Sequence, residues 1–345
     1  MRLRDLGIAV GNLPTGAFNA ITDVPGIQVG QASWSIDRPT IQRTGVTVIF
    51  PSEDPYRHPL YAATDVLNGF GELTGRAAID EWGLLSSPIV LTNTRSVGQG
   101  YNAIFEHFYS IVREDEASLP LPVVGECDDS FLNDSRFATP LSTFKSAFGA
   151  VGAKEVEEGG VGAGTGMHLF GYKGGIGTSS RMVEIDGRHF TVGVLLNTNF
   201  GRPHQMRPIA GLEIEGQSRE VDQEGSCIGV VATDAPLWPH ELKRMARRIG
   251  LGLSRTGSVG NDGSGEIFLA FSTLDPKAVP SVAGRDGPFT GRGDGAPMSH
   301  LFDAVVEASE EAVWNALLAA KTTQGVQGHS VEGFLEGKGR EGSET

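Results

Sequence analysis

The residues best suited to chemistry lie around Ser264, in the stretch Ser258-Val259-Gly260-Asn261-Asp262-Gly263-Ser264-Gly265-Glu266. An apolar run at 267–272 follows at once and is typical of a strand buried on both faces. Glycines on both sides leave the Ser264 hydroxyl and the Gly263 carbonyl sterically open. A nucleophile needs that access to attack its own peptide bond or an incoming acyl group. The same residues also fit an ordinary turn before a strand, so the stretch alone leaves both interpretations open.

A second candidate site is the run Glu126-Cys127-Asp128-Asp129, which follows a predicted strand at 121–125. Three carboxylates in four residues cannot all be buried and ionised without partners. They fit a solvated loop, a metal site or a site for the ammonium group of a substrate. Because no other oxygen-rich cluster lies nearby in the sequence, we favour the ammonium over the metal.

Polar side chains on two further elements could support a reaction. Asn197-Thr198-Asn199 follows a predicted hairpin over 182–196 whose turn is Asp186-Gly187. The two asparagine amides could donate hydrogen bonds to a developing oxyanion, or could cap the turn. Ser309 falls on the apolar stripe of a predicted helix over 299–320, where a hydroxyl usually bonds the carbonyl one turn back.

The remaining pattern predicts the strands and helices that would hold these side chains. Strands are predicted at 44–50, 87–92, 121–125 and 227–232, and helices at 77–83, 104–112 and 242–253. Thr233-Asp234-Ala235-Pro236 resembles the start of the helix predicted through 242–253. The glycine-dense segment 159–181 contains neither of the common phosphate-binding patterns, so we expect strands and turns packed against another backbone there.

Composition narrows the possible function classes. The 345 residues carry a net charge of −14 without an extended basic cluster, which argues against nucleic acid and anionic membranes as partners. No segment approaches the ~20 apolar residues of a membrane span. The N-terminus lacks the apolar core of a signal peptide, so we expect a cytoplasmic protein. Only Cys127 and Cys227 occur and the histidines are scattered, so we expect no disulfide framework, metal or other cofactor.

Several short motifs occur in order along nearly the whole chain. They are Asn19-Ala20-Ile21-Thr22-Asp23-Val24-Pro25-Gly26, Leu91-Thr92-Asn93-Thr94, Gly162-Ala163-Gly164-Thr165-Gly166-Met167, Lys173-Gly174-Gly175-Ile176-Gly177-Thr178-Ser179-Ser180-Arg181, Ala232-Thr233-Asp234-Ala235-Pro236-Leu237 and Asp262-Gly263-Ser264-Gly265-Glu266-Ile267-Phe268. In their number and order they resemble the self-processing family of L-aminopeptidase D-esterases and β-peptidyl aminopeptidases, the DmpA family. The resemblance favours the nucleophile over the turn at Ser264.

The resemblance implies a fold and a processing step. The fold would be a four-layer αββα sandwich similar to N-terminal-nucleophile hydrolases, with its own connectivity. It would form a single domain over 1–335, followed by a flexible tail at 336–345 and assembled as a homo-oligomer, a tetramer by the family pattern. The chain would cut itself between Gly263 and Ser264 into an α chain, 1–263, and a β chain, 264–345.

The resemblance also implies roles for individual residues. Ser264 would be the nucleophile, served by a second serine and a glutamate that match Ser309 and Glu311. Positions two apart on a helix point to nearly opposite sides, so Glu310 is the alternative partner. The oxyanion donor matches Asn199, with Asn197 as the alternative. Glu126 matches the acid that holds the free ammonium of the substrate.

One departure from the family pattern concerns Asp128. The family often has Glu-Thr-Tyr-Asp-Gly where this chain has Glu126-Cys127-Asp128-Asp129-Ser130, so no tyrosine hydroxyl is available to support the oxyanion.

The expected substrates are small peptides, amides or esters with a free amino group. Two alternatives are a self-processing acyltransferase like the ornithine acetyltransferases, which use threonine rather than serine, and an unprocessed binding protein without turnover.

Overall fold

Two sheets lie at the centre of the protein in a computed structural model that describes residues 1–113, 115–212, 225–278 and 297–336. The larger sheet has the order β4-β3-β12-β11-β10-β9 and the smaller β1-β2-β5-β6. β11 and β12 run parallel, as do β5 and β6, and the other pairs are antiparallel. The strands are β1 (Gln28–Ile36), β2 (Gln42–Phe50), β3 (Leu60–Val66), β4 (Leu84–Leu85), β5 (Ile89–Asn93), β6 (Val123–Cys127), β9 (Gly175–Ile185), β10 (Arg188–Asn199), β11 (Ser226–Thr233) and β12 (Gly265–Ser272).

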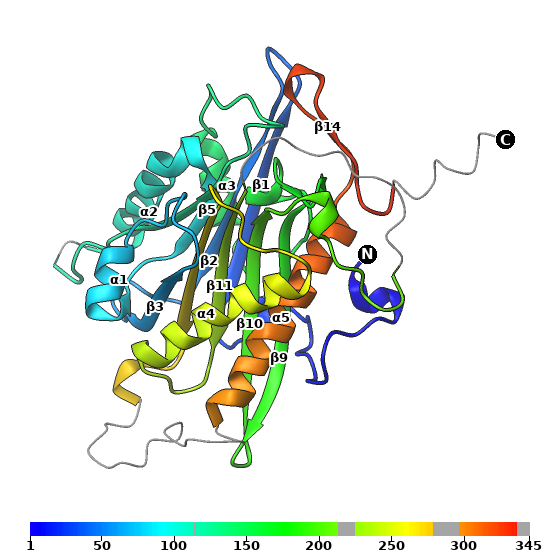
Figure 1. Ribbon diagram of the computed structural model, residues 1–345. Helices are drawn as coiled ribbons and strands as arrows, with labels where there is room; N and C mark the ends of the chain where they lie inside the picture. Colours follow the sequence, from blue (N-terminus) through cyan, green and yellow to red (C-terminus); the bar gives the residue numbers. More distant parts are fainter. Residues whose placement is uncertain (114, 213–224, 279–296, 337–345) are drawn as a thin grey trace.

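Helices cover the outer face of each sheet (Figure 1). α4 (Pro239–Arg255) and α5 (Pro297–Ala319) pack on the six-stranded sheet, and α2 (Val97–Ile111) and α3 (Leu141–Gly149) on the four-stranded sheet. The result is four layers in the order αββα, which confirms the predicted fold class. Shorter elements are α1 (Arg76–Trp82), the two-residue strands at His168–Leu169, Tyr172–Lys173, Thr323–Gln324 and Ser330–Val331, and 3-10 turns at Leu3–Leu6, Ile21–Asp23, Thr94–Ser96, Gly162–Gly164, Pro203–Gln205, Pro276–Ala278 and Val326–Gly328.

β12 illustrates why the sheets are buried on both sides. Ile267, Leu269 and Phe271 join the core between the two sheets, whereas Phe268 and Ala270 join the core under α4 and α5. Alternate residues of a strand point to opposite faces, so a continuous apolar run supplies both cores. The strand predicted after Ser264 is therefore confirmed.

The start of α4 differs from the sequence prediction. Thr233 is the last residue of β11, and Asp234 accepts a hydrogen bond from the Thr191 amide at 2.7 Å rather than capping a helix. The helix begins at Pro239, where Glu241 accepts a hydrogen bond from the Trp238 amide at 2.9 Å. A proline and an acidic residue thus mark the start as expected, but one turn later.

The glycine-dense segment packs against other backbones, as predicted. A Cβ on Gly175 would lie 2.0 Å from the Gly159 carbonyl oxygen, and one on Gly177 would lie 1.9 Å from that of Ala312 in α5. Both distances are far inside van der Waals contact, so only glycine permits this approach of β9 to its neighbours.

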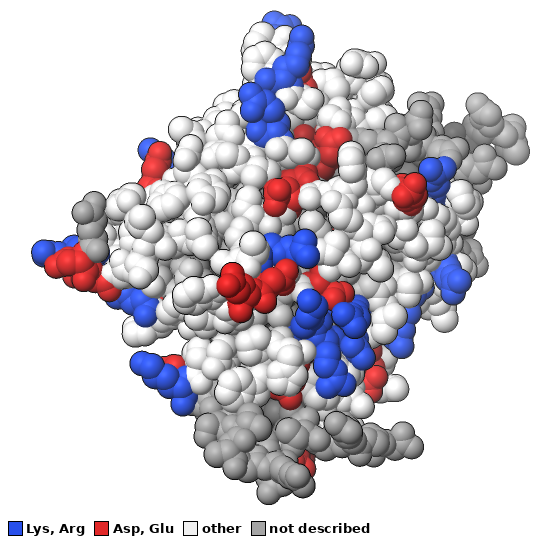
Figure 2. Space-filling model, turned by 60° about the vertical axis from the view of Figure 1, so that its left-hand side comes forward, with Lys and Arg blue, Asp and Glu red and all other residues white. Residues whose placement is uncertain are grey.

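On the face drawn in Figure 2, one group of basic side chains lies in the lower centre beside acidic side chains, and the other charged groups are separated by uncharged residues. Within the described ranges, no helix combines the length and the apolar character that crossing a bilayer requires.

Candidate active site

Ser264 stands at the start of β12, directly after a tight turn. Its amide donates a hydrogen bond to the Asn261 carbonyl at 3.1 Å, which closes a β-turn from Asn261 to Ser264. Gly263 adopts a φ of 82°, a left-handed conformation that favours glycine. The turn therefore holds the Gly263–Ser264 peptide bond at the edge of the six-stranded sheet.

Glu266 contacts the Ser264 hydroxyl, and no reasoning from the sequence singled it out. The Ser264 Oγ donates to the Glu266 Oε1 at 2.5 Å, and both residues are buried. Residues two apart on a strand share a face, so the Ser264-Gly265-Glu266 spacing could have predicted this pair. Burial raises the pKa of Glu266, and hydrogen bonds from Ser264 and Asn68 oppose the shift.

Asn199 reaches the same edge from β10. The strand register aligns Asn199 with Ser226 and Ser226 with Gly265. The Asn199 Nδ2 donates to the Asp128 carbonyl at 2.9 Å and to the Ser226 Oγ at 3.2 Å, and its Oδ1 accepts from the His168 amide at 3.1 Å. These contacts fix the amide orientation, with the donor group directed to the edge of the sheet.

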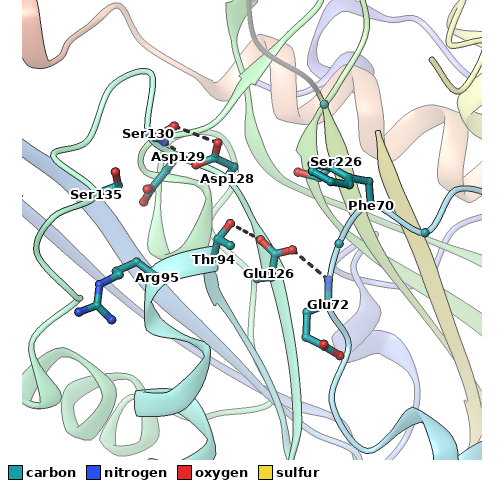
Figure 3. Close-up of a pocket in the computed structure, with 13 residues that line it drawn as sticks. Phe70, Glu72, Thr94, Arg95, Glu126, Asp128, Asp129, Ser130, Ser135 and Ser226 are labelled. Carbon is teal, nitrogen blue, oxygen red and sulfur yellow. Dashed lines mark hydrogen bonds between the residues drawn. The ribbon is translucent and has the colours of Figure 1, made fainter. Parts of the chain in front are cut away.

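A pocket of about 850 Å³ opens beside this edge (Figure 3). Its lining residues come from three segments and the start of β11: Gly69, Phe70, Gly71, Glu72, Thr94, Arg95, Glu126, Asp128, Asp129, Ser130, Ser135, Gly225 and Ser226. Gly225 links the pocket to the nucleophile, because a Cβ there would lie 3.2 Å from the Ser264 Oγ. The pocket can therefore present a substrate to Ser264.

Glu126 provides a buried carboxylate in the middle of the pocket. Its Oε1 accepts from the Glu72 amide at 2.9 Å, and its Oε2 accepts from the Thr94 hydroxyl. A Cβ on Gly71 would lie 3.3 Å from the Glu126 Oε1 and 3.4 Å from the Gly265 Cα, so only Gly71 separates this carboxylate from the start of β12. Burial raises the pKa of Glu126, with Asp128 adding to the rise and the two hydrogen bonds opposing it.

The other two carboxylates of the run have different surroundings. Ser130 donates to Asp128 through its amide and its hydroxyl, each at 2.9 Å. Asp129 is buried and accepts from Asn93 at 2.9 Å and from Asn133 at 3.0 Å, and burial raises its pKa to about 7. Among the residues that the structure describes, no three His, Cys, Asp or Glu side chains are grouped as a metal site requires.

Ser309 and Glu311 lie on α5, the helix that packs on β9 and β10. Glu311 accepts from the Arg181 Nη2 at 2.7 Å, the Arg4 Nε at 2.9 Å and the Asn19 Nδ2 at 2.5 Å. Ser309 packs against Gly252 of α4, where a Cβ would lie 2.4 Å from the Ser309 Cβ. Its hydroxyl has no hydrogen-bond partner among the described residues, so the expected bond to a carbonyl one turn back is not formed. The alternative, Glu310, pairs with Arg255 at 3.2 Å.

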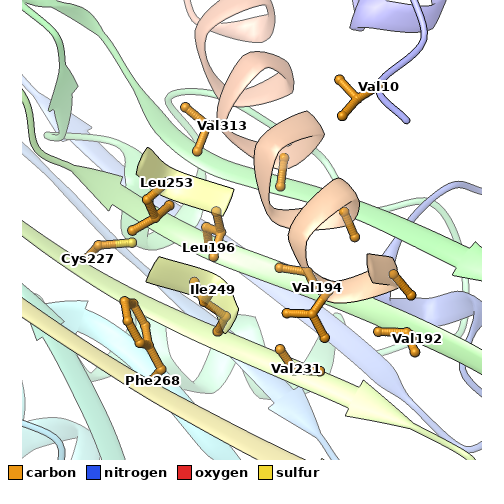
Figure 4. Close-up of a cluster of buried hydrophobic side chains, with 14 of the residues drawn as sticks. Val10, Val192, Val194, Leu196, Cys227, Val231, Ile249, Leu253, Phe268 and Val313 are labelled. Atoms are coloured by element: carbon orange, nitrogen blue, oxygen red, sulfur yellow. The ribbon is translucent and has the colours of Figure 1, made fainter. Parts of the chain in front are cut away.

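The strand register shows how far apart these groups are. Arg181 aligns with Val192, Val192 with Thr233, and Thr233 with Ser272 at the far end of β12. Glu311 itself is next to Ala312, which contacts Gly177, and the Gly177 row meets β12 at Phe268. At ~3.3 Å per residue along β12 and ~4.8 Å per strand across the sheet, Glu311 lies on the order of 20 Å from Ser264. An apolar core that includes Val194, Leu196 and Val313 fills the space between α5 and the sheet (Figure 4). Ser264, Asn199 and Glu126 thus lie at one edge of the sheet, and within the described residues no hydrogen bond or ion pair joins Ser309, Glu310 or Glu311 to them.

Glu311 also differs from the site carboxylates in its charge state. Burial alone would raise its pKa, but Arg181, Arg4 and Asn19 together hold the pKa below the ordinary value.

Asn197, the alternative oxyanion donor, is fully buried two residues before Asn199 on β10.

Known proteins resemble this chain over nearly its whole length. The model of peptidase family S58 matches residues 19–331. A β-peptidyl aminopeptidase of Sphingosinicella microcystinivorans is 38% identical over 358 aligned positions, which cover 96% of this chain and 89% of that protein.

Solved structures agree with the sequence matches. A β-aminopeptidase of a Burkholderia species superposes with a TM-score of 0.84 at 39% identity, covering 98% of each chain. The L-aminopeptidase D-Ala-esterase/amidase of Ochrobactrum anthropi superposes with a TM-score of 0.82 at 37% identity, covering 96% of this chain and 95% of that one. That enzyme is described as a prototype of the serine aminopeptidases and as a variant of the N-terminal-nucleophile hydrolase fold.

Proposed function

Because the chain belongs to peptidase family S58 and is a serine aminopeptidase of the N-terminal-nucleophile type, we propose that Ser264 is its nucleophile and is freed by self-cleavage after Gly263. The observation that carries the proposal is the placement of Ser264 between the Gly263 turn and the pocket, with its hydroxyl bonded to Glu266 at 2.5 Å. Cleavage would give chains 1–263 and 264–345 from one domain over 1–335. Residues 337–345 of the predicted tail lie outside the described residues.

Glu126 would bind the free ammonium group of the substrate. Each of its carboxylate oxygens accepts one hydrogen bond within the protein and keeps capacity for another. An ammonium held there places the neighbouring carbonyl toward Gly225 and Ser264. This arrangement favours an aminopeptidase, which needs a free amino group, over an endopeptidase.

Asn199 would stabilise the oxyanion that forms when Ser264 attacks. Its Nδ2 lies at the pocket edge and donates to the Asp128 carbonyl and the Ser226 Oγ, so the oxyanion would take the place of the longer of these two acceptors, Ser226. Asp128 stands where the family often has a tyrosine, and its charge would favour a substrate ammonium and oppose an oxyanion nearby. The donor role therefore falls on Asn199 rather than on this position.

The substrates we propose are small peptides, amides or esters with an unblocked N-terminal residue. The relatives are named as a β-peptidyl aminopeptidase and as an L-aminopeptidase D-Ala-esterase/amidase, so β-linked and D-configured residues belong in any substrate panel. The net charge of −14 gives no support to nucleic acid as a partner.

Location and assembly complete the proposal. Cys127 and Cys227 are both free and buried, which fits a reducing, cytoplasmic location. We expect a homo-oligomer, a tetramer by the family pattern, and size-exclusion chromatography with light scattering would test it.

The test compares amino-acid p-nitroanilides with their N-acetylated forms. The wild type should cleave the free amines at least about tenfold faster, because acetylation removes the charge that Glu126 binds. Ser264→Ala should abolish turnover. Ser258→Ala is the matched control, since the hydroxyl of this buried serine accepts a single hydrogen bond within the described residues, from the Gly260 amide at 3.3 Å. Turnover by Ser264→Ala would refute the nucleophile, and equal rates on both substrate forms would refute the ammonium site.

A further inference from the structure

We propose that Glu266 is the catalytic residue that accepts the proton of the Ser264 hydroxyl during self-cleavage and again during peptide hydrolysis. The inference rests on the proposed function and names the group that makes Ser264 reactive. It assigns to Glu266 the role that the family resemblance gives to Ser309 and Glu311.

Geometry gives the first argument. The Ser264 Oγ and the Glu266 Oε1 are 2.5 Å apart, within the range in which a carboxylate removes a proton directly. Glu266 is 1% exposed, and the parallel pairing of β12 with β11 aligns its backbone with Cys227. The carboxylate is thus held next to the hydroxyl.

The other carboxylates near the pocket are bound to other donors. Glu126 accepts from Glu72 and Thr94, and Asp128 accepts from Ser130. Glu311 is bound to arginines on the order of 20 Å away. Among the described residues, Glu266 is the acid that contacts the hydroxyl.

The order of events gives the second argument. Before cleavage, the Ser264 nitrogen is an amide bonded to the Asn261 carbonyl and cannot accept a proton. The free α-amine that serves many N-terminal nucleophiles exists only after the cut. The first reaction of the chain therefore needs a different base, and Glu266 is already in contact.

The surroundings of Glu266 suit this task. Burial raises its pKa above the ordinary glutamate value and so makes the carboxylate a stronger base, while Ser264 and Asn68 oppose the shift. The titratable groups beside it are the Cys127 and Cys227 thiols, whose own pKa values are raised by burial, so both thiols stay neutral. In contrast to Glu311, no arginine or lysine pairs with Glu266 among the described residues.

The self-cleavage step balances as follows. The Ser264 O–H bond breaks, its proton moves to Glu266, and the Oγ bonds to the Gly263 carbonyl carbon. The Gly263 C–N bond then breaks as the Ser264 nitrogen takes the proton from Glu266, leaving an ester. Water attacks this ester, giving its proton to Glu266, and the Oγ leaves with that proton. The products are a Gly263 carboxylic acid, which passes its remaining proton to the free Ser264 amine or to solvent to become a carboxylate, and the Ser264 amine with its hydroxyl restored.

The experiment follows cleavage of freshly synthesised, pulse-labelled full-length chain in a cell-free system. Four variants accompany the wild type: Glu266→Gln, Glu266→Asp, Glu311→Gln and Ser264→Ala. Glu266→Gln keeps the shape but cannot accept the proton, so its cleavage should slow by about 100-fold or more. Glu266→Asp should retain part of the rate, Glu311→Gln should cleave its folded fraction at the wild-type rate, and Ser264→Ala should stay intact.

A pH profile separates chemistry from structure. The wild-type cleavage rate should rise with pH through a pKa above the ordinary ~4.3 of glutamate, because the base must be ionised and burial raises its pKa. The cleavage rate of Glu266→Gln should not show this rise with pH. If Glu266→Gln does not fold, the self-cleavage rate of Glu266→Asp and the pH profile of the wild type test the role of Glu266 instead.

The outcomes distinguish the two proposals. Two results would refute the role of Glu266 but keep Ser264 as the nucleophile. In the first, folded Glu266→Gln cleaves itself as fast as the wild type. In the second, the cleavage rate of the wild type does not fall at acid pH. A wild-type chain that never cleaves overturns the proposed function itself.

Discussion

Two buried glutamates, Glu266 on β12 and Glu311 on α5, show how partners rather than burial decide what a carboxylate does. Glu266 is 1% exposed and Glu311 is fully buried. Glu311 is bound by two arginines and an asparagine, and its pKa is lowered. Glu266 is bound by a serine hydroxyl, and its pKa is raised. The arginines make one glutamate a structural anion, and their absence beside the other leaves it able to exchange a proton.

The structural glutamate belongs to a network that joins the N-terminal segment to α5 and β9. Arg4 and Arg181 bind Glu311, Arg181 also binds Glu307 at 3.1 Å, and Arg2 binds Glu158 at 2.6 Å. The network lies on β9 and α5, three strands across the sheet from the β12 strand that follows Ser264. Changes there should alter stability, and changes at the Ser264 edge should alter chemistry.

The largest effect on stability should come from Glu311→Gln. Breaking one partner of a buried ion pair leaves unpaired arginine charge, so we expect the free energy of unfolding to fall by about 3–5 kcal/mol. Urea unfolding monitored by circular dichroism measures this. The matched control is Glu310→Gln, whose pair with the half-exposed Arg255 should be worth about 1 kcal/mol or less. An equal loss of stability in Glu311→Gln and Glu310→Gln would contradict the structural role of the Glu311 ion pairs.

The same contrast predicts a pH dependence. Because the folded state lowers the pKa of Glu311, its contribution to stability is present above the ordinary glutamate pKa and is lost as the pH falls through the lowered value. The wild type should therefore lose more stability on acidification than Glu311→Gln does. Parallel stability curves for the two proteins between neutral and acid pH would argue against an ionised Glu311.

At the other edge, Asn199→Ala should lower kcat by about 100–1,000-fold, as loss of an oxyanion donor does. Stability should change less than in Glu311→Gln. Ser226→Ala serves as the control, since it removes a partner of the Asn199 amide at 3.2 Å and keeps the donor. A similar kcat for Asn199→Ala and the wild type would remove Asn199 from the mechanism.

Glu126→Gln should have a smaller effect that depends on the substrate. Loss of a charged hydrogen-bond acceptor costs about 1.5–3 kcal/mol, so kcat/KM for free-amine substrates should drop by about 10–100-fold. N-acetylated substrates should be unaffected, because they carry no ammonium. A uniform drop on both substrate forms would assign Glu126 a structural role instead.

The smallest effect concerns Gly263, measured in a Ser264→Ala background that cannot cleave. Its φ of 82° should make Gly263→Ala lose about 1–2 kcal/mol of stability. Gly98→Ala, where a Cβ meets no atom within 4 Å, should be neutral or slightly stabilising. Equal stability of the two variants would show that the turn tolerates a side chain.

The sequence predicted local features of the site better than its long-range ones. The turn at Gly263, the strand after Ser264, and the placements of Glu126 and Asn199 follow from residue types within a few positions of each residue. The position of Glu311 depends on how α5 packs across β9, which is a tertiary contact that helical spacing does not encode. Glu266 was within reach of local reasoning, because positions i and i+2 of a strand share a face.

Intact mass under denaturing conditions tests the central claim most directly. Purified wild type should give two chains, with N-terminal sequencing of the smaller one starting at Ser264, and Ser264→Ala should give one chain of 36.5 kDa. A single 36.5 kDa species in a wild-type preparation that hydrolyses amino-acid p-nitroanilides would contradict the account.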